Sequence, residues 1–144
     1  MTETFESVLA DVQSELVAVS LEYASGTVSD IYIYGSIESG VSVFNVFFVV
    51  DGHVAKKHQL PGVDVSAGRQ DALLGWGQTQ LRRLVEAGAK YARPVPTEMR
   101  LHYVVPSGSL DSEFAYTPQN SAEAARHPNH ELQEWLDSVA QAIG

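Results

Sequence analysis

Cysteine is absent from this chain of 144 residues. Its absence excludes disulfide bonds, zinc sites with thiolate ligands and catalysis by a thiol. Long apolar runs are missing too, because the longest, Val46 to Val50, falls far short of the ~20 residues that cross a bilayer. No basic segment followed by an apolar one opens the chain, so we expect no secretory signal and a cytoplasmic location.

Positive charge is also scarce. The 9 Lys and Arg residues stand against 18 Asp and Glu residues, which gives a net charge of −9 at pH 7. Nucleic acids and anionic membranes both attract Lys and Arg, so we expect neither kind of partner. The acidity either keeps the protein in solution or complements a protein partner with a basic surface, and composition alone does not decide between the two.

The residues that are present are typical of one globular domain spanning residues 1–144, with 44% hydrophobic and 19% charged residues. Apolar residues spaced by three and four from Phe5 to Val19 predict a first helix. From Asp30 the apolar period changes to two, which predicts a strand through Ile37 and a second over 41–50. Asp51-Gly52 predicts a hairpin into a third strand over 53–60.

The second half of the chain repeats the two periodicities. We expect a long helix from about Ser66 to Tyr91, in which Gly75, Gly77 and Gly88 favour a bend or an early end. Strands over 99–105 and 110–117 and a last helix over 131–143 follow. The order α-β-β-β-α-β-β-α predicts an α+β fold, an antiparallel sheet with helices packed on one face.

Motifs of catalysis and cofactor binding are missing from the sequence. Neither the nucleophile elbow Gly-x-Ser-x-Gly nor a glycine-rich phosphate loop occurs. His127 and His130 lie three residues apart, but Pro128 separates them and no third ligand is near in sequence. Asp111 and Glu113 share one face of a strand, where solvated acids are expected. We therefore expect no cofactor, no metal and no catalysis.

The aromatic residues suggest a binding surface. If the isoleucines of 30–37 face the helices, Tyr32 and Tyr34 point to the opposite, open face of the sheet. Tyrosines on an open face serve as anchors in interfaces, although tyrosine is common in strands for packing reasons alone. Trp76 and Trp135 lie near helical apolar stripes, so we expect both to pack against the sheet.

Several segments, taken in order, carry a resemblance to a known family. They are Ile31-Tyr32-Ile33-Tyr34-Gly35, Val50-Asp51-Gly52-His53, Lys57-His58-Gln59-Leu60, Met99-Arg100-Leu101-His102-Tyr103, the turn at Gly108, Phe114-Ala115-Tyr116 and Trp135. From about residue 30 onward the chain resembles the YezG-like family of bacterial immunity proteins (antitoxins). The resemblance implies a cytoplasmic protein that binds and blocks a cognate toxin, often a nuclease with a basic groove.

On this interpretation the expected partner contacts are Tyr32, Tyr34, Glu38, Asp111 and Glu113. Two alternatives stay open. The order of elements is also similar to that of type III secretion chaperones, which act as homodimers and hold an extended effector segment. An enzyme would instead need a deep pocket with converging polar groups, for which the surroundings of His102 and the hairpin of Asp111 and Glu113 are the candidates.

Overall fold

The computed structural model describes residues 3–25, 27–38, 41–116 and 128–143. The α+β class and the predicted order of elements are confirmed. In chain order the elements are α1 (Phe5–Ala24), β1 (Asp30–Glu38), β2 (Val41–Val50), β3 (His53–Lys56), the 3-10 helix η1 (Lys57–Gln59), α2 (Ala67–Tyr91), β4 (Glu98–Val104), β5 (Ser109–Ala115) and α3 (Pro128–Ile143).

The five strands form one antiparallel sheet in the order β3-β2-β1-β4-β5, so that β1 lies at its centre. The hairpin between β2 and β3 turns at Asp51 and Gly52, whose φ angles of 51° and 79° are left-handed. Such angles give the tight two-residue turn that the Asp-Gly pair predicts. In the register, Tyr32 of β1 lies opposite Phe47 of β2 and His102 of β4. This register decides which side chains share a face.

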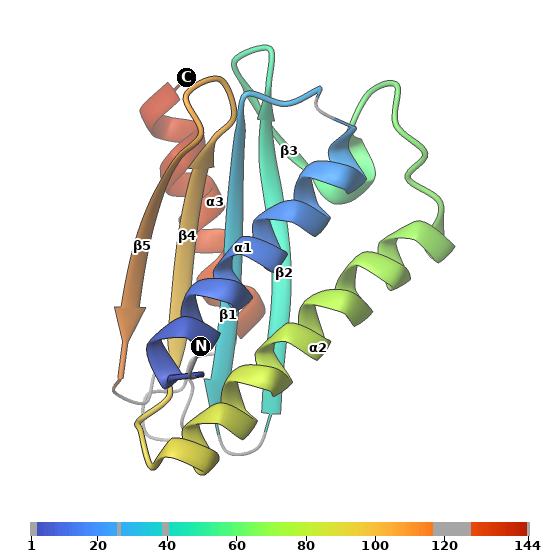
Figure 1. The fold of residues 1–144 in the computed structure, drawn as a ribbon. Helices are drawn as coiled ribbons and strands as arrows, with labels where there is room; N and C mark the ends of the chain where they lie inside the picture. Colours follow the sequence, from blue (N-terminus) through green and yellow to red (C-terminus); the bar gives the residue numbers. More distant parts are fainter. Residues whose placement is uncertain (1–2, 26, 39–40, 117–127, 144) are drawn as a thin grey trace.

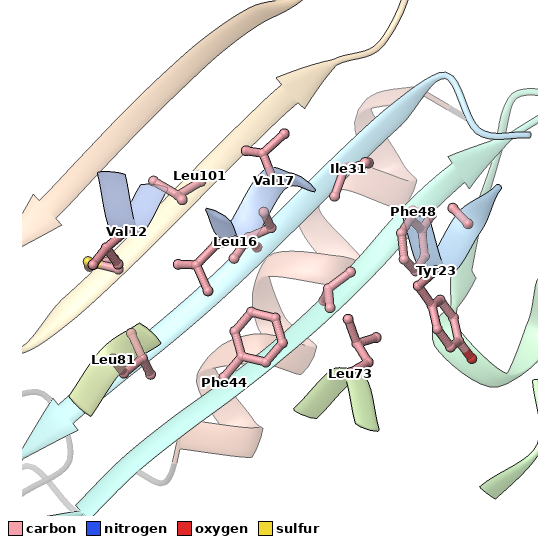
Figure 2. Packing of buried hydrophobic residues seen from close by; sticks show 14 of the residues in the cluster. Val12, Leu16, Val17, Tyr23, Ile31, Phe44, Phe48, Leu73, Leu81 and Leu101 are labelled. Atoms are coloured by element: carbon pink, nitrogen blue, oxygen red, sulfur yellow. The ribbon is translucent and has the colours of Figure 1, made fainter. Parts of the chain in front are cut away.

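The main hydrophobic core lies between one face of the sheet and the helices α1 and α2 (Figure 1). Helix α1 begins with a capping box, in which the Thr4 hydroxyl accepts a hydrogen bond from the Ser7 amide at 3.1 Å. Figure 2 shows Leu16 of α1 and Leu81 of α2 pointing toward the sheet beside Phe44 of β2. All three side chains are fully buried or nearly so.

Helix α3 corrects one part of the predicted fold. We expected all helices on one face, but α3 lies behind the sheet, on the face opposite α1 and α2 (Figure 1). It packs over β2 and β3, where Trp135 and its apolar neighbours cover Phe47 and Tyr32. The physical reason is that both faces of β1 and β2 are apolar or aromatic, so the second face also needs a cover.

Helix α2 does not end early at its glycines but continues to Tyr91. A Cβ atom at Gly77 would lie only 2.1–2.5 Å from three ring carbons of Phe44, and one at Gly88 would lie 2.3 Å from a methyl carbon of Val95. These two glycines therefore let the helix approach its neighbours closely. Gly75, by contrast, has no such neighbour within 4 Å.

The third strand is shorter than predicted. It ends at Lys56, and η1 replaces the expected strand residues that follow. Two hydrogen bonds hold this turn: the Gln59 side chain accepts from the Lys56 amide at 2.9 Å, and the Tyr23 hydroxyl donates to the Lys57 carbonyl at 2.8 Å. A side chain from α1 thus fixes the backbone where the strand stops.

Candidate functional site

The strand register places all five predicted contact residues on one face of the sheet, the face that α3 partly covers. Tyr32, Tyr34 and Glu38 alternate along β1, and successive side chains of a strand point to opposite faces. Through β4, Tyr32 aligns with Asp111 of β5, and Tyr34 aligns with Glu113. Glu38, half-buried, lies about 13 Å farther along β1 than Tyr34, at a rise of about 3.3 Å per residue.

The predicted exposure of the two tyrosines is wrong. Tyr34 is fully buried and Tyr32 is 8% exposed. The Tyr32 ring stacks on Phe47, with 4.8 Å between ring centroids, and on His102 at 4.2 Å, while Trp135 of α3 meets it edge-on at 5.5 Å. The two tyrosines do point away from α1 and α2, as expected, but α3 and its neighbours cover them. They contribute to the packing of this chain rather than to its surface.

Beneath α3 lie four side chains, here called the polar cluster: the buried Tyr34, Glu98 and Glu131 and the half-buried Arg100. The Tyr34 hydroxyl donates to Oε2 of Glu98 at 3.1 Å. Arg100 donates from Nε to Oε1 of Glu98 at 3.1 Å, and its Nη2 lies 3.4 Å from Oε2 of Glu131. One arginine therefore joins a carboxylate of β4 to a carboxylate of α3.

The polar cluster joins β1, β4 and α3, and its two carboxylates are screened from solvent. Glu98 is 9% exposed and Glu131 3%. Burial, followed by the negative charge of Glu98, raises the pKa of Tyr34 well above its ordinary value of 10.0. Its hydroxyl therefore stays protonated and remains a hydrogen-bond donor at neutral pH. The Arg100 guanidinium also lies over the Trp135 ring, 5.2 Å from the centroid.

Toward β5 the same face is open. Asp111 and Glu113 are both exposed on β5, an edge strand of the sheet. Next to Asp111 lies His102, whose Nε2 is 2.7 Å from Oδ2 of Asp30. We call Asp30, Asp111 and Glu113 the acidic strip. Together with Glu98 and Glu131 of the polar cluster, these carboxylates outnumber the basic groups Arg100 and His102, so this half of the face is acidic.

The pair of His102 and Asp30 is similar to part of an acid–base site, since a carboxylate that orients an imidazole is a common catalytic unit. Among the described residues, no serine or threonine hydroxyl is hydrogen-bonded to His102. The imidazole, 31% exposed in its side chain, is held between Asp30 and the Tyr32 ring. This arrangement positions a surface histidine.

The remaining sequence predictions had mixed outcomes. Trp135 packs against the sheet, as expected, whereas Trp76 of α2 is 45% exposed, so its predicted packing is wrong. His127 lies outside the described residues, and His130 contacts Glu134 one helical turn later at 3.1 Å. Within the described ranges, no three His, Asp or Glu side chains lie close enough to hold a metal ion.

Sequence reasoning missed the polar cluster. The signal was present in β4, where Glu98, Arg100 and His102 alternate with the apolar Met99 and Leu101. This alternation places three polar side chains on the face of Tyr32 and Tyr34, where they need partners if anything covers them. The sequence does not show that α3 is the cover.

No family model and no curated protein matches this chain. In the part of the chain that the structure describes, no helix is long and apolar enough to cross a membrane. The YezG-like resemblance therefore stays a prediction.

Proposed function

We propose that this protein acts by binding another protein, a partner with a basic surface, and that it catalyses no reaction. The observation that carries the proposal is the part of the acidic strip that lies on the edge strand β5. Asp111 and Glu113 are exposed, lie two residues apart on one face of β5, and belong to a chain of net charge −9. Such a surface speeds the encounter with a basic partner and disfavours acidic ones.

The position of β5 adds to this proposal. Among the described strands β5 pairs only with β4, so its outer edge has main-chain N–H and C=O groups without a strand partner. A protein that docks here gains hydrogen bonds to these groups as well as ion pairs with the acidic strip. Of the residues expected as contacts, we retain Asp111, Glu113 and Glu38 and withdraw the two buried tyrosines.

The immunity function is the more specific form of the proposal. A nuclease toxin presents a basic groove to its substrate, and an acidic protein that occupies the groove blocks the reaction. On this proposal the protein is cytoplasmic, where it protects the cell from the toxin, and it needs no cofactor. The support for this form is the YezG-like resemblance together with the acidic strip.

Reversal of charge on the strip tests the proposal. The double variant Asp111→Lys/Glu113→Lys and the control Asp71→Lys/Glu86→Lys both change the net charge from −9 to −5, because each of the two replacements adds two charges. The control residues are exposed on α2. Tagged proteins are recovered from the native cells, and the bound proteins are identified and quantified by mass spectrometry at two salt concentrations.

We expect the wild type and the control to retain one basic partner near one-to-one, and the strip variant to lose it by about tenfold or more at low salt. Equal recovery by all three proteins contradicts the role of the strip. Recovery of several secreted substrates by a homodimeric protein would favour the chaperone interpretation. A wild type that retains no partner would contradict the binding function and favour an enzyme.

A further inference from the structure

A second feature lies at the other end of the same sheet face, under α3. A pocket of about 290 Å³ opens between β2, the β3–η1 corner and α3. Phe47 of β2 and Leu132 and Leu136 of α3 form its apolar wall, and Lys56, Lys57 and His58 form its basic wall. None of the residues that line it is an aspartate or glutamate. In a chain with twice as many acids as bases, this local excess of positive charge is unexpected.

Lys57 is the central group of this pocket. Its side chain is half-buried, and its Nζ donates to Oδ1 of Asn45 at 3.1 Å. Across the described residues neither Lys56 nor Lys57 has a carboxylate partner. Burial lowers the pKa of Lys57, and the charge of Lys56 lowers it further. The ammonium is thus partly desolvated, close to a like charge and short of a counter-charge.

The Lys57 backbone is fixed before any ligand binds. The Tyr23 hydroxyl holds the Lys57 carbonyl, and the Gln59 side chain holds the Lys56 amide, so the corner that carries both lysines is tied at two points. Asn45 fixes the ammonium itself from β2. A site whose groups are held in place loses little conformational entropy on binding.

We propose that this pocket binds a small carboxylate with an apolar body, such as a medium-chain fatty acid or an aryl carboxylate. The carboxylate meets Lys57 and Lys56, and the apolar body lies against Phe47, Leu132 and Leu136. The volume is at the lower end of small-molecule sites, which suits a ligand of this size. The site is separate from the acidic strip, and its existence does not depend on the proposed protein partner.

The first test uses the unaltered protein. Octanoate, octanamide and sodium sulfate are titrated separately into the ¹⁵N-labelled chain, and binding is followed by NMR. We expect octanoate to shift the amides of Phe47, His58 and Leu132 and to bind at least tenfold more tightly than octanamide, which has the same chain without the charge. Equal binding of octanoate and octanamide overturns the role of the lysines. Binding of sulfate as tight as that of octanoate overturns the role of the apolar wall.

The second test uses the variant Lys57→Met, with Lys90→Met as its matched control. Lys90 lies on α2, on the opposite side of the sheet from the pocket, where it is exposed and forms an ion pair with Glu3. We expect Lys57→Met to weaken octanoate binding at least tenfold and Lys90→Met to leave it unchanged. Should Lys57→Met fail to fold, Lys56→Met gives the same comparison on an exposed residue of the basic wall. Octanoate binding that both variants of the wall retain, or no binding by the wild type at millimolar concentration, overturns the proposal.

Discussion

Two glycines of α2, only two residues apart, should respond differently to the same substitution. In the interior of a helix, Gly→Ala stabilises by about 1 kcal/mol, because glycine loses more backbone entropy on folding. A Cβ atom at Gly75 would meet no atom within 4 Å, so Gly75→Ala should show this gain undiminished. For a chain of this size, about 1 kcal/mol corresponds to a rise of about 3 °C in Tm.

Gly77→Ala should instead leave the stability of the protein unchanged or lower it. The added Cβ would lie 2.1–2.5 Å from ring carbons of Phe44, whereas two carbon atoms pack at about 3.5–4.0 Å. Phe44 is 3% exposed, so the ring cannot swing into solvent and either α2 or β2 must shift. Overpacking of this kind costs about 1–3 kcal/mol, which equals or exceeds the helix gain and leaves a net loss of up to about 2 kcal/mol.

Urea denaturation followed by circular dichroism measures both variants under one condition. The difference between them should be about 1–3 kcal/mol, with Gly75→Ala above the wild type and Gly77→Ala level with it or below. Equal stabilisation by both substitutions would refute the close packing of α2 on β2. Equal destabilisation would refute the open surroundings of Gly75.

Three further substitutions concern the polar cluster and its cover, and urea denaturation measures each. Arg100→Met should cost about 3 kcal/mol, because it removes the guanidinium that pairs with two buried carboxylates, whereas Arg83→Met, which breaks an exposed ion pair, should cost far less. Trp135→Ala should cost about 3 kcal/mol and should abolish much of the near-ultraviolet circular dichroism, because the indole packs against two aromatic rings. Tyr34→Phe should cost about 2 kcal/mol at neutral pH, through loss of a hydrogen bond to a carboxylate. The pKa of Tyr34 in the folded protein is higher than its ordinary value of 10.0, so above about pH 10 the unfolded state loses this proton more readily than the folded state does. The stability of the wild type should therefore fall as the pH rises past about 10, and Tyr34→Phe should make that fall shallower.

The alternation of apolar residues predicted most of the fold because it reports directly on local backbone geometry. Ile31 and Ile33 define one face of β1, and the Asp-Gly pair at Asp51 specifies the turn that follows β2. The face chosen by α3 could not be predicted in this way. An apolar stripe shows that a helix is buried, but it does not show which of two sheet faces buries it.

The error over the tyrosines has the same origin. The pattern correctly placed Tyr32 and Tyr34 on the face away from α1, but their exposure depended on where a helix almost 100 residues later would dock. The pocket of Lys57 could not be predicted from the sequence either. It forms where β3 ends at Lys56 and where the Tyr23 hydroxyl of α1 holds the Lys57 carbonyl. Both features come from contacts between distant parts of the chain, and local propensity carries no information about such contacts.

The helices on the two faces of the sheet are held by different kinds of interaction, and this difference makes α3 relevant to both proposals. Helix α1 buries eight residues in an almost wholly apolar core, whereas α3 is held by a few half-buried apolar side chains and by the ion pair of Arg100 with the buried Glu131. Segments with few buried apolar contacts open locally at low free energy. Helix α3 also forms one wall of the lysine pocket and carries a carboxylate of the polar cluster next to the acidic strip. A carboxylate ligand that contacts both Lys57 and the apolar wall would therefore stabilise α3, the one described helix that covers this face. Protection of the α3 amides from hydrogen exchange should rise with the concentration of the ligand. Protection of the α1 amides should stay constant.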